Sequence, residues 1–293
     1  EHPYGRYNSL PLLEAGSQAL TAEALRAMSP TVLRPDGARI IVVGDTDPAS
    51  LKPLLEAAFG DWTPPAAAAP RRELPPVVVP TGARVFLFDL PGAEQSLVSA
   101  ADLSLPVTAP EHEAADLANA VLGGLFTSRL NINLREQKHW TYGAFSGLQE
   151  SVGPGLFAAR ASIETPHTAA AMAEMRREIA EVAGKRPPTP AELDAARKSL
   201  VRALPGQAET AGGVLALYQR LLAFGLPTDR YSGYGERLAA LKPADVARAA
   251  AKLARPEALT WFVVGDLAKI EADIRKLKLG PVTVLNARGE TLR

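Results

Sequence analysis

An arginine and a tyrosine seven residues apart are the side chains in this sequence best suited to act together on a ligand. Arg135 is expected near the end of a long helix, and Tyr142 near the start of the next strand. Both side chains could then face one cleft, where a guanidinium and a phenol can bind peptide carbonyl groups or stabilise a tetrahedral oxyanion. The same spacing also suits a solvated arginine and a half-buried strand tyrosine, so both interpretations stay open.

Other familiar catalytic and metal-binding arrangements are missing from the sequence. There is no cysteine, which excludes disulfides, thiolate zinc sites and cysteine nucleophiles. No serine elbow or nucleotide-binding glycine motif occurs. No two of the four histidines stand three to five residues apart, as a helical zinc pair requires; they are at positions 2, 112, 139 and 167. We interpret His112 and its acidic neighbours as a solvated first helical turn.

The elements that must position Arg135 and Tyr142 follow from hydrophobic periodicity. A helix begins at Pro110 and carries a buried apolar stripe that Gly123-Gly124 interrupts. Five strands are also expected: two next to the site, two upstream that could pair as neighbours, and a final one near the end of the chain. Their ranges are 140–149, 155–164, 83–90, 95–103 and 259–264.

Further helices follow the strands, at about 167–184, 189–204 and 208–224. Thr189 and Glu192 form a capping box at the start of the second. This order of elements predicts an α+β fold, an antiparallel sheet with helices packed on one face.

An internal repeat sets the organisation of the chain. Residues 20–45 align without a gap onto residues 241–266, an offset of 221. Arg34-Pro35 falls on Arg255-Pro256, and the two Val-Val-Gly-Asp segments coincide. Because one register holds through a helix, a turn and a strand, duplication explains the match better than chance.

The repeat divides the chain into three parts. Residues 1–62 are expected to be the C-terminal part of a truncated first domain, and residues 77–293 a complete second domain. Residues 63–76, rich in proline and alanine, are the expected linker, because proline favours an extended strap. The abrupt start at Glu1 suggests a piece of a longer polypeptide.

Length, composition and charge narrow the class of protein. The 293 residues are 47% hydrophobic and 22% charged, which suits a globular core. Thirty-two basic residues balance 32 acidic ones, so nucleic acid, which requires a basic face, is not expected as a partner. No apolar stretch approaches the roughly 20 residues of a membrane helix.

Three motifs around the candidate site resemble the C-terminal half of the M16 peptidases, the family of pitrilysin, insulinase and the mitochondrial processing peptidase. They are Ser128-Arg129-Leu130, Leu134-Arg135-Glu136 and Trp140-Thr141-Tyr142-Gly143. The start, His2-Pro3-Tyr4-Gly5-Arg6, and Val42-Val43-Gly44-Asp45 resemble the end of that family's first domain. The resemblance implies two homologous halves of the LuxS/MPP-like metallohydrolase type, joined by a linker around a chamber.

The resemblance also implies a zinc endopeptidase whose metal site lies outside this chain. In that family a His-x-x-Glu-His motif and a distant Glu in the first half hold zinc, and this sequence contains no such motif. We therefore expect no cofactor here and zinc in a missing half or partner. The family's second half supplies an Arg and a Tyr that bind the substrate backbone and the scissile carbonyl, and Arg135 and Tyr142 match them in type and spacing.

Two functions fit this resemblance. The chain is the non-zinc half of an M16-type zinc metalloendopeptidase, or else a non-catalytic subunit that binds peptides or scaffolds a heterodimer. Either way it is expected to be inactive alone, with unfolded peptide and a zinc-binding M16 half or subunit as partners. A homodimer is a further expected partnership. Secreted and periplasmic bacterial relatives favour the periplasm, with the cytoplasm as the alternative.

Overall fold

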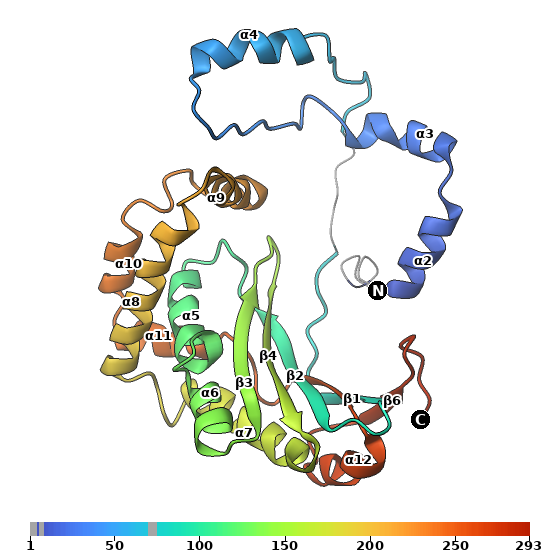
Figure 1. Ribbon diagram of the computed structural model, residues 1–293, viewed down its shortest axis with the longest axis vertical. Coiled ribbons are helices and arrows are strands. Elements are labelled where there is room, and N and C mark those ends of the chain that lie inside the picture. Colours follow the sequence, from blue (N-terminus) through green and yellow to red (C-terminus); the bar gives the residue numbers. More distant parts are fainter. Residues whose placement is uncertain (1–4, 6–8, 70–74) are drawn as a thin grey trace. The chain divides into compact units, whose positions relative to one another are not determined.

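Six strands form one mixed sheet in the computed structural model, which describes residues 5, 9–69 and 75–293 (Figure 1). The sheet has the order β3-β4-β2-β5-β1-β6. Antiparallel pairs join β2 to β4, β2 to β5 and β3 to β4, whereas β1 runs parallel to β5 and β6. The strands are β1 (Arg84–Asp89), β2 (Gln95–Ser104), β3 (Thr141–Gln149), β4 (Gly155–Glu164), β5 (Thr260–Gly265) and β6 (Val282–Leu285).

The sheet differs from the sequence prediction in two respects. It is mixed rather than antiparallel throughout, and the prediction that β1 and β2 pair directly was wrong because β5 lies between them. The short connection from β1 to β2 crosses the end of β5. There Leu90 N donates to Gly265 O at 2.8 Å, and Gly92 N donates to the Asp266 carboxylate at 3.2 Å. The second Val-Val-Gly-Asp motif thus holds this crossing in place.

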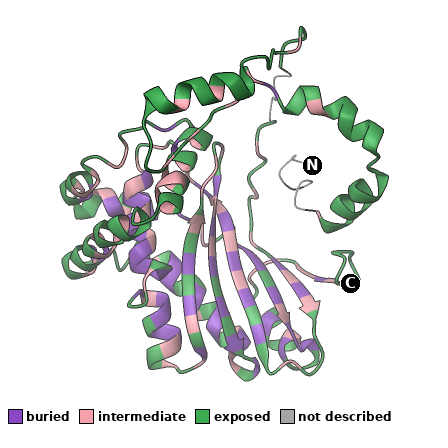
Figure 2. Ribbon diagram, turned by 45° about the horizontal axis from the view of Figure 1, so that its top comes forward, coloured by how far each residue is buried: buried purple, intermediate pink, exposed green. Residues whose placement is uncertain are grey.

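Helices cover one face of the sheet. α7 (Thr168–Val182) packs against β2 and β4, α12 (Leu267–Lys276) against β1, and α5 (His112–Asn119) against β3. Buried residues alternate with more exposed ones along β2 (Figure 2), as a strand with one covered face requires. The predicted α+β fold with helices on one face is confirmed.

Two helices after α7 lie close to their predicted ranges, α8 (Pro190–Gln207) and α9 (Ala211–Phe224). α10 (Tyr234–Ala240) and α11 (Pro243–Ala250) follow them. The predicted capping box of α8 is confirmed, since Thr189 N donates to Glu192 Oε2 at 2.8 Å and Glu192 N donates to Thr189 Oγ1 at 3.3 Å.

The chain divides into two compact units. One comprises residues 1–78 and 207–220, and the other, with the sheet, comprises 79–206 and 221–293. The smaller unit contains α2 (Leu10–Ala19), α3 (Ala22–Val32) and α4 (Pro48–Phe59). His2-Pro3-Tyr4 and residues 70–74 of the expected linker lie outside the described residues.

The two copies of the repeat differ in one element. The second forms α11, a turn, β5 and α12, and the first forms α3, a turn and α4. Residues 39–44, which correspond to β5, form no strand, so a strand in the first copy was a wrong prediction for this chain. β5 is hydrogen-bonded by β1 and β2, whereas no described segment pairs with residues 39–44.

Candidate functional site

Arg135 and Tyr142 line the same pocket, which has a volume of about 330 Å³. The pocket is formed by the start of β2, the end of β4, the start of β3 and the helical turn before β3. Its other lining residues are Gln95, Glu136, His139, Thr141 and Glu164. The structure therefore brings the two candidate side chains to one place, together with two carboxylates.

The Arg135 guanidinium is held by stacking rather than by hydrogen bonds from the pocket. Arg135 lies in η2, a π-helical turn (Ile132–Gln137), and its Cζ lies 4.4 Å from the centre of the Phe126 ring. Its Nη1 is 3.5 Å from Glu136 Oε1 and has no hydrogen-bond partner among the described residues. Stacking on Phe126 therefore orients the guanidinium, and its buried Nη1 is a donor without a hydrogen bond in the described structure.

A β-bulge presents Tyr142 to solvent. The pairing of β3 with β4 shifts register between Thr141 and Ala144, and Tyr142 lies in that shift with 87% of its surface exposed. Thr141 Oγ1 donates to Ser162 O at 2.6 Å and accepts from Gly143 N at 3.1 Å. A Cβ at Gly143 would lie 2.6 Å from Cε2 of the Phe145 ring, so this half-exposed ring would have to move.

The connection between Arg135 and Tyr142 is short and tightly turned. Lys138 N donates to Asn133 O at 3.1 Å, and Trp140 N donates to Leu134 O at 3.0 Å. His139 between them has a φ of 59°, an uncommon conformation for a residue other than glycine. This turn ends the helical segment and directs the chain into β3, which places both candidate residues on the pocket.

The helical segment that carries Arg135 is fixed from three directions. Leu130 and Leu134 are fully buried in the core. Arg129, from α6 (Arg129–Asn131), binds the start of α8: Nε lies 2.7 Å from Glu192 Oε1, and Nη2 lies 2.8 Å from Oε2. Asn133 Nδ2 donates to Glu174 and Glu178 of α7, each at 2.8 Å.

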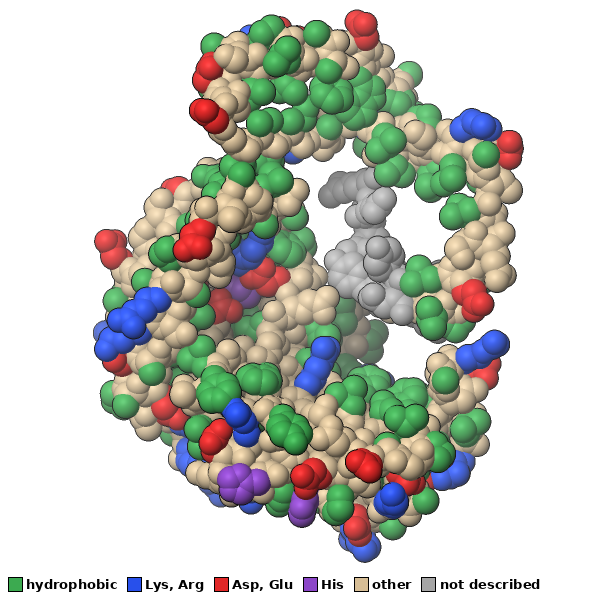
Figure 3. All heavy atoms as spheres, viewed as in Figure 1, with side chains coloured by type: hydrophobic (Ala, Val, Ile, Leu, Met, Phe, Trp, Pro, Cys, Tyr) green, Lys and Arg blue, Asp and Glu red, His purple; other side chains and the backbone are tan. Residues whose placement is uncertain are grey.

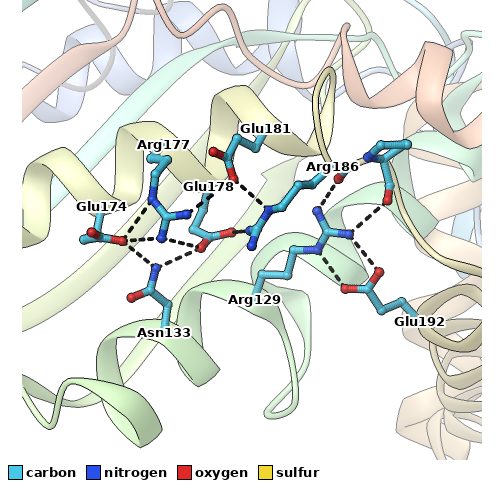
Figure 4. A network of polar contacts seen from close by, with 9 residues as sticks. Arg129, Asn133, Glu174, Arg177, Glu178, Glu181, Arg186 and Glu192 are labelled. Atoms are coloured by element: carbon cyan, nitrogen blue, oxygen red, sulfur yellow. Dashed lines mark hydrogen bonds and ion pairs between the residues drawn. The ribbon is translucent and has the colours of Figure 1, made fainter.

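These contacts belong to one network of charged and polar side chains (Figure 4). Glu178 is 2% exposed and is paired with both Arg177 and Arg186. Burial raises the pKa of Glu192, but hydrogen bonds from Arg129 and Thr189 outweigh it and lower that pKa to about 2. The Glu192 carboxylate is therefore ionised at neutral pH. The network holds the Arg135 segment against two helices.

His112 is not the solvated residue that the sequence suggested. It is 2% exposed, and its Nε2 lies 3.0 Å from Glu150 Oε1 and 3.7 Å from Asp116 Oδ2. Glu150 follows β3, so the buried imidazole has a polar partner that is distant in sequence. In the described part of the chain no three or more metal-binding side chains form a cluster.

Sequence reasoning missed the residues that support the pair, above all Phe126 and Asn131. Asn131 is a fully buried polar residue next to the buried Leu130. A buried polar side chain in an apolar helical stripe was the available signal, because such groups are retained where they satisfy hydrogen bonds.

Acidic and basic side chains are interspersed over the face in Figure 3. Among the described residues, no helix is both long and apolar enough to span a membrane.

The chain is similar to a family model and to several solved structures. Residues 19–200 match the model described as the peptidase M16 inactive domain. A peptidase M16 inactive domain from Pseudomonas fluorescens is 21% identical with a TM-score of 0.74, covering 84% of this chain and 57% of that one. A protease from Helicobacter pylori is 20% identical with a TM-score of 0.74, covering 84% and 60%. No curated protein matches the chain.

The periplasmic protease PqqL from Escherichia coli is 16% identical with a TM-score of 0.69, covering 97% of this chain and 34% of that one. The chain thus spans less than two thirds of the length of these solved relatives. The similarity of these structures shows a common fold, and at such low sequence identity it shows the fold alone. The family model covers more than half of the chain, and the matched range includes Arg135 and Tyr142. The chain therefore belongs to the peptidase M16 family and contains its inactive domain.

Proposed function

We propose that this chain is the non-zinc half of an M16-type zinc metalloendopeptidase, which binds unfolded peptide and supplies Arg135 and Tyr142 to an active site formed with a zinc-binding half. The observation that carries the proposal is their common pocket of about 330 Å³. A charged guanidinium and an exposed phenol are donors for the carbonyl oxygens of a peptide. Glu136 and Glu164 in the same pocket can accept its N–H groups.

The two side chains have separate roles in this proposal. Arg135 binds the peptide backbone in the ground state, since its guanidinium is pre-oriented on Phe126. Tyr142 donates its phenol proton as a hydrogen bond to the scissile carbonyl, an interaction that strengthens as negative charge develops on that oxygen. Water activation by zinc would come from the other half.

Peptide binding can be measured with this chain alone. Fluorescence anisotropy of fluorescein-labelled casein, an unfolded polypeptide, should show binding that Arg135→Ala weakens about 10- to 100-fold, as expected for a lost charged hydrogen bond. Arg248→Ala is the matched control, because that arginine is exposed and pairs only with Asp245 in the described structure. Equal affinity in wild type and Arg135→Ala would refute the proposed binding role.

Turnover requires the assembled enzyme. When the chain is combined with a zinc-binding M16 half, Tyr142→Phe should lower kcat about 100- to 1,000-fold while changing peptide affinity little. Tyr218→Phe, at another exposed tyrosine, is the control. Peptide binding without cleavage in the assembly would instead favour the non-catalytic subunit, and loss of kcat and affinity to the same degree would contradict the role of Tyr142.

We further propose that residues 1–62 are the end of a first M16-like domain, followed by a linker over residues 63–76 and a complete second domain over residues 77–293. A groove of about 570 Å³ within residues 1–62 is lined by Ile40 and Val42 and by Leu51, Leu55 and Phe59 of α4. Ile40 is 55% and Val42 47% exposed. Their counterparts in the repeat, Trp261 and Val263, are fully buried. The groove therefore fits strands from the rest of that domain.

The domain proposal predicts that residues 39–44 become a strand when the zinc-binding half is present. Amide hydrogen exchange in this segment should slow at least about 100-fold on assembly, since paired strands exchange through larger openings. Residues 63–69 provide an internal control that should not change. Exchange in residues 39–44 that stays equally fast in the assembled enzyme would overturn the proposal.

The periplasmic relative PqqL supports the same compartment for the complete protein.

A further inference from the structure

One buried amide connects the supports of Arg135 and Tyr142. Asn131 is 0% exposed and uses both ends of its side chain. Its Nδ2 donates to Phe126 O at 2.6 Å, and its Oδ1 accepts from Ala144 N at 3.1 Å. Phe126 carries the ring under the Arg135 guanidinium, and Ala144 ends the bulge that contains Tyr142.

Both attachments need an internal partner. Phe126 is 58% exposed, so packing against the core holds it only weakly. The hydrogen bond from Asn131 to the Phe126 carbonyl group anchors the loop that carries this residue. Among the described residues β3 is the last strand on its side of the sheet, so no described strand pairs with the Ala144 N–H on that side. The Asn131 carboxamide supplies both partners, and the two contacts share one rigid planar group.

Asn119 makes a similar contact two residues further along β3. Its Oδ1 accepts from Ser146 Oγ at 2.7 Å, and its Nδ2 donates to Ser146 O at 3.4 Å. Two asparagine amides therefore satisfy successive polar groups on the outer edge of β3. Only Asn131 also reaches the loop that supports Arg135, which makes Asn119 a matched control.

We propose that Asn131 is a positioning residue that sets the distance and orientation between the Arg135 guanidinium and the Tyr142 phenol for an extended peptide backbone. The inference rests on the proposed function of that pair. In this proposal Asn131 couples the position of the Phe126 loop to that of the β3 bulge. Without the Asn131 amide the two move independently, and Arg135 no longer binds the same peptide as Tyr142. Asn131 itself does not touch the peptide.

A double-mutant cycle on the full chain tests this coupling with fluorescein-labelled casein. Arg135→Ala should weaken binding about 10-fold or more in wild type and less than about 2-fold in Asn131→Ala, because residues that act together are not additive. In Asn119→Ala the effect of Arg135→Ala should equal that in wild type. A merely structural role of Asn131 would lower stability and leave the two affinity losses additive.

Two further variants keep the test decisive if Asn131→Ala does not fold. Asn131→Asp keeps the size and the acceptor for Ala144 N but removes the donor to Phe126 O. Phe126→Ala changes an exposed side chain and removes only the ring. Both should reduce the Arg135→Ala effect to less than half of its wild-type size on a logarithmic scale. An unchanged effect in both variants overturns the inference, whereas no effect of Arg135→Ala in wild type overturns the proposed function itself.

Discussion

Replacing Glu192 by glutamine is expected to destabilise the larger unit in a pH-dependent manner. Arg129 and Thr189 both bind the Glu192 carboxylate and lower its pKa from an ordinary value of 4.5 to about 2, despite the opposite effect of burial. Since each tenfold change in proton affinity is worth about 1.4 kcal/mol, the upper limit is about 3 kcal/mol. A third of the side chain is exposed, and screening by solvent reduces the expected value to about 1 to 2 kcal/mol at neutral pH.

The direction of the pH dependence follows from the lowered pKa. A carboxyl group that is more acidic in the folded protein stabilises it fully above the unfolded pKa, and that stabilisation is lost as the pH falls through the folded value. For Glu192 this window runs from pH 4.5 down to about 2. Wild type and Glu192→Gln should therefore differ most at neutral pH and converge in acid.

Urea unfolding followed by tryptophan fluorescence measures this difference. In a Trp62→Phe background the remaining tryptophans, Trp140 and Trp261, both report on the larger unit. Glu236→Gln, at an exposed glutamate in the first turn of α10, controls for the general effect of charge removal. A loss of stability that is the same at neutral pH and at about pH 3 would refute the charge-based argument.

Two core contacts of the same unit give further predictions. Gly123→Ala would place a Cβ 2.5 Å from Ser146 N, so the free energy of unfolding, measured in urea, should fall by about 1 to 3 kcal/mol. An unchanged free energy of unfolding would mean that β3 can move away. Asp102→Asn removes the charge of a carboxylate that is 5% exposed and lies 2.6 Å from Arg255 Nη2. The free energy of unfolding should fall by about 1.5 to 3 kcal/mol, and an unchanged melting temperature would contradict this.

Local patterns predicted most elements of the larger unit but not how its strands pair. β3 and β4 were predicted within a residue, because alternation of apolar and polar residues is a local property. The position of β5 between β1 and β2 depends on hydrogen bonds between residues about 175 positions apart, such as Phe86 with Phe262. Strands that follow one another in sequence usually pair in the sheet, and this rule gave the wrong pairing for β1 and β2.

The candidate site shows the same limit at the level of side chains. The seven-residue spacing predicted a possible Arg135 and Tyr142 pair, and the structure places both on one pocket. The ring of Phe126, the bulge at Thr141 and the amide of Asn131 act through contacts that no spacing reveals. His112 shows the reverse error: its acidic sequence neighbours suggested a solvated side chain, but it is buried and contacts Glu150.

The two copies of the repeat explain why a sequence motif alone does not make a strand. Arg255 binds Asp102 of β2 through Nε at 3.0 Å and also donates to Pro80 O, so the second copy is completed by distant segments. The corresponding Arg34 binds Asp36, two residues away in the same turn. Residues 39–44 carry the same apolar pattern as β5 but lack strands on either side within the described chain. A strand exists only where neighbours accept its hydrogen bonds, and residues 39–44 have no such neighbours among the described residues.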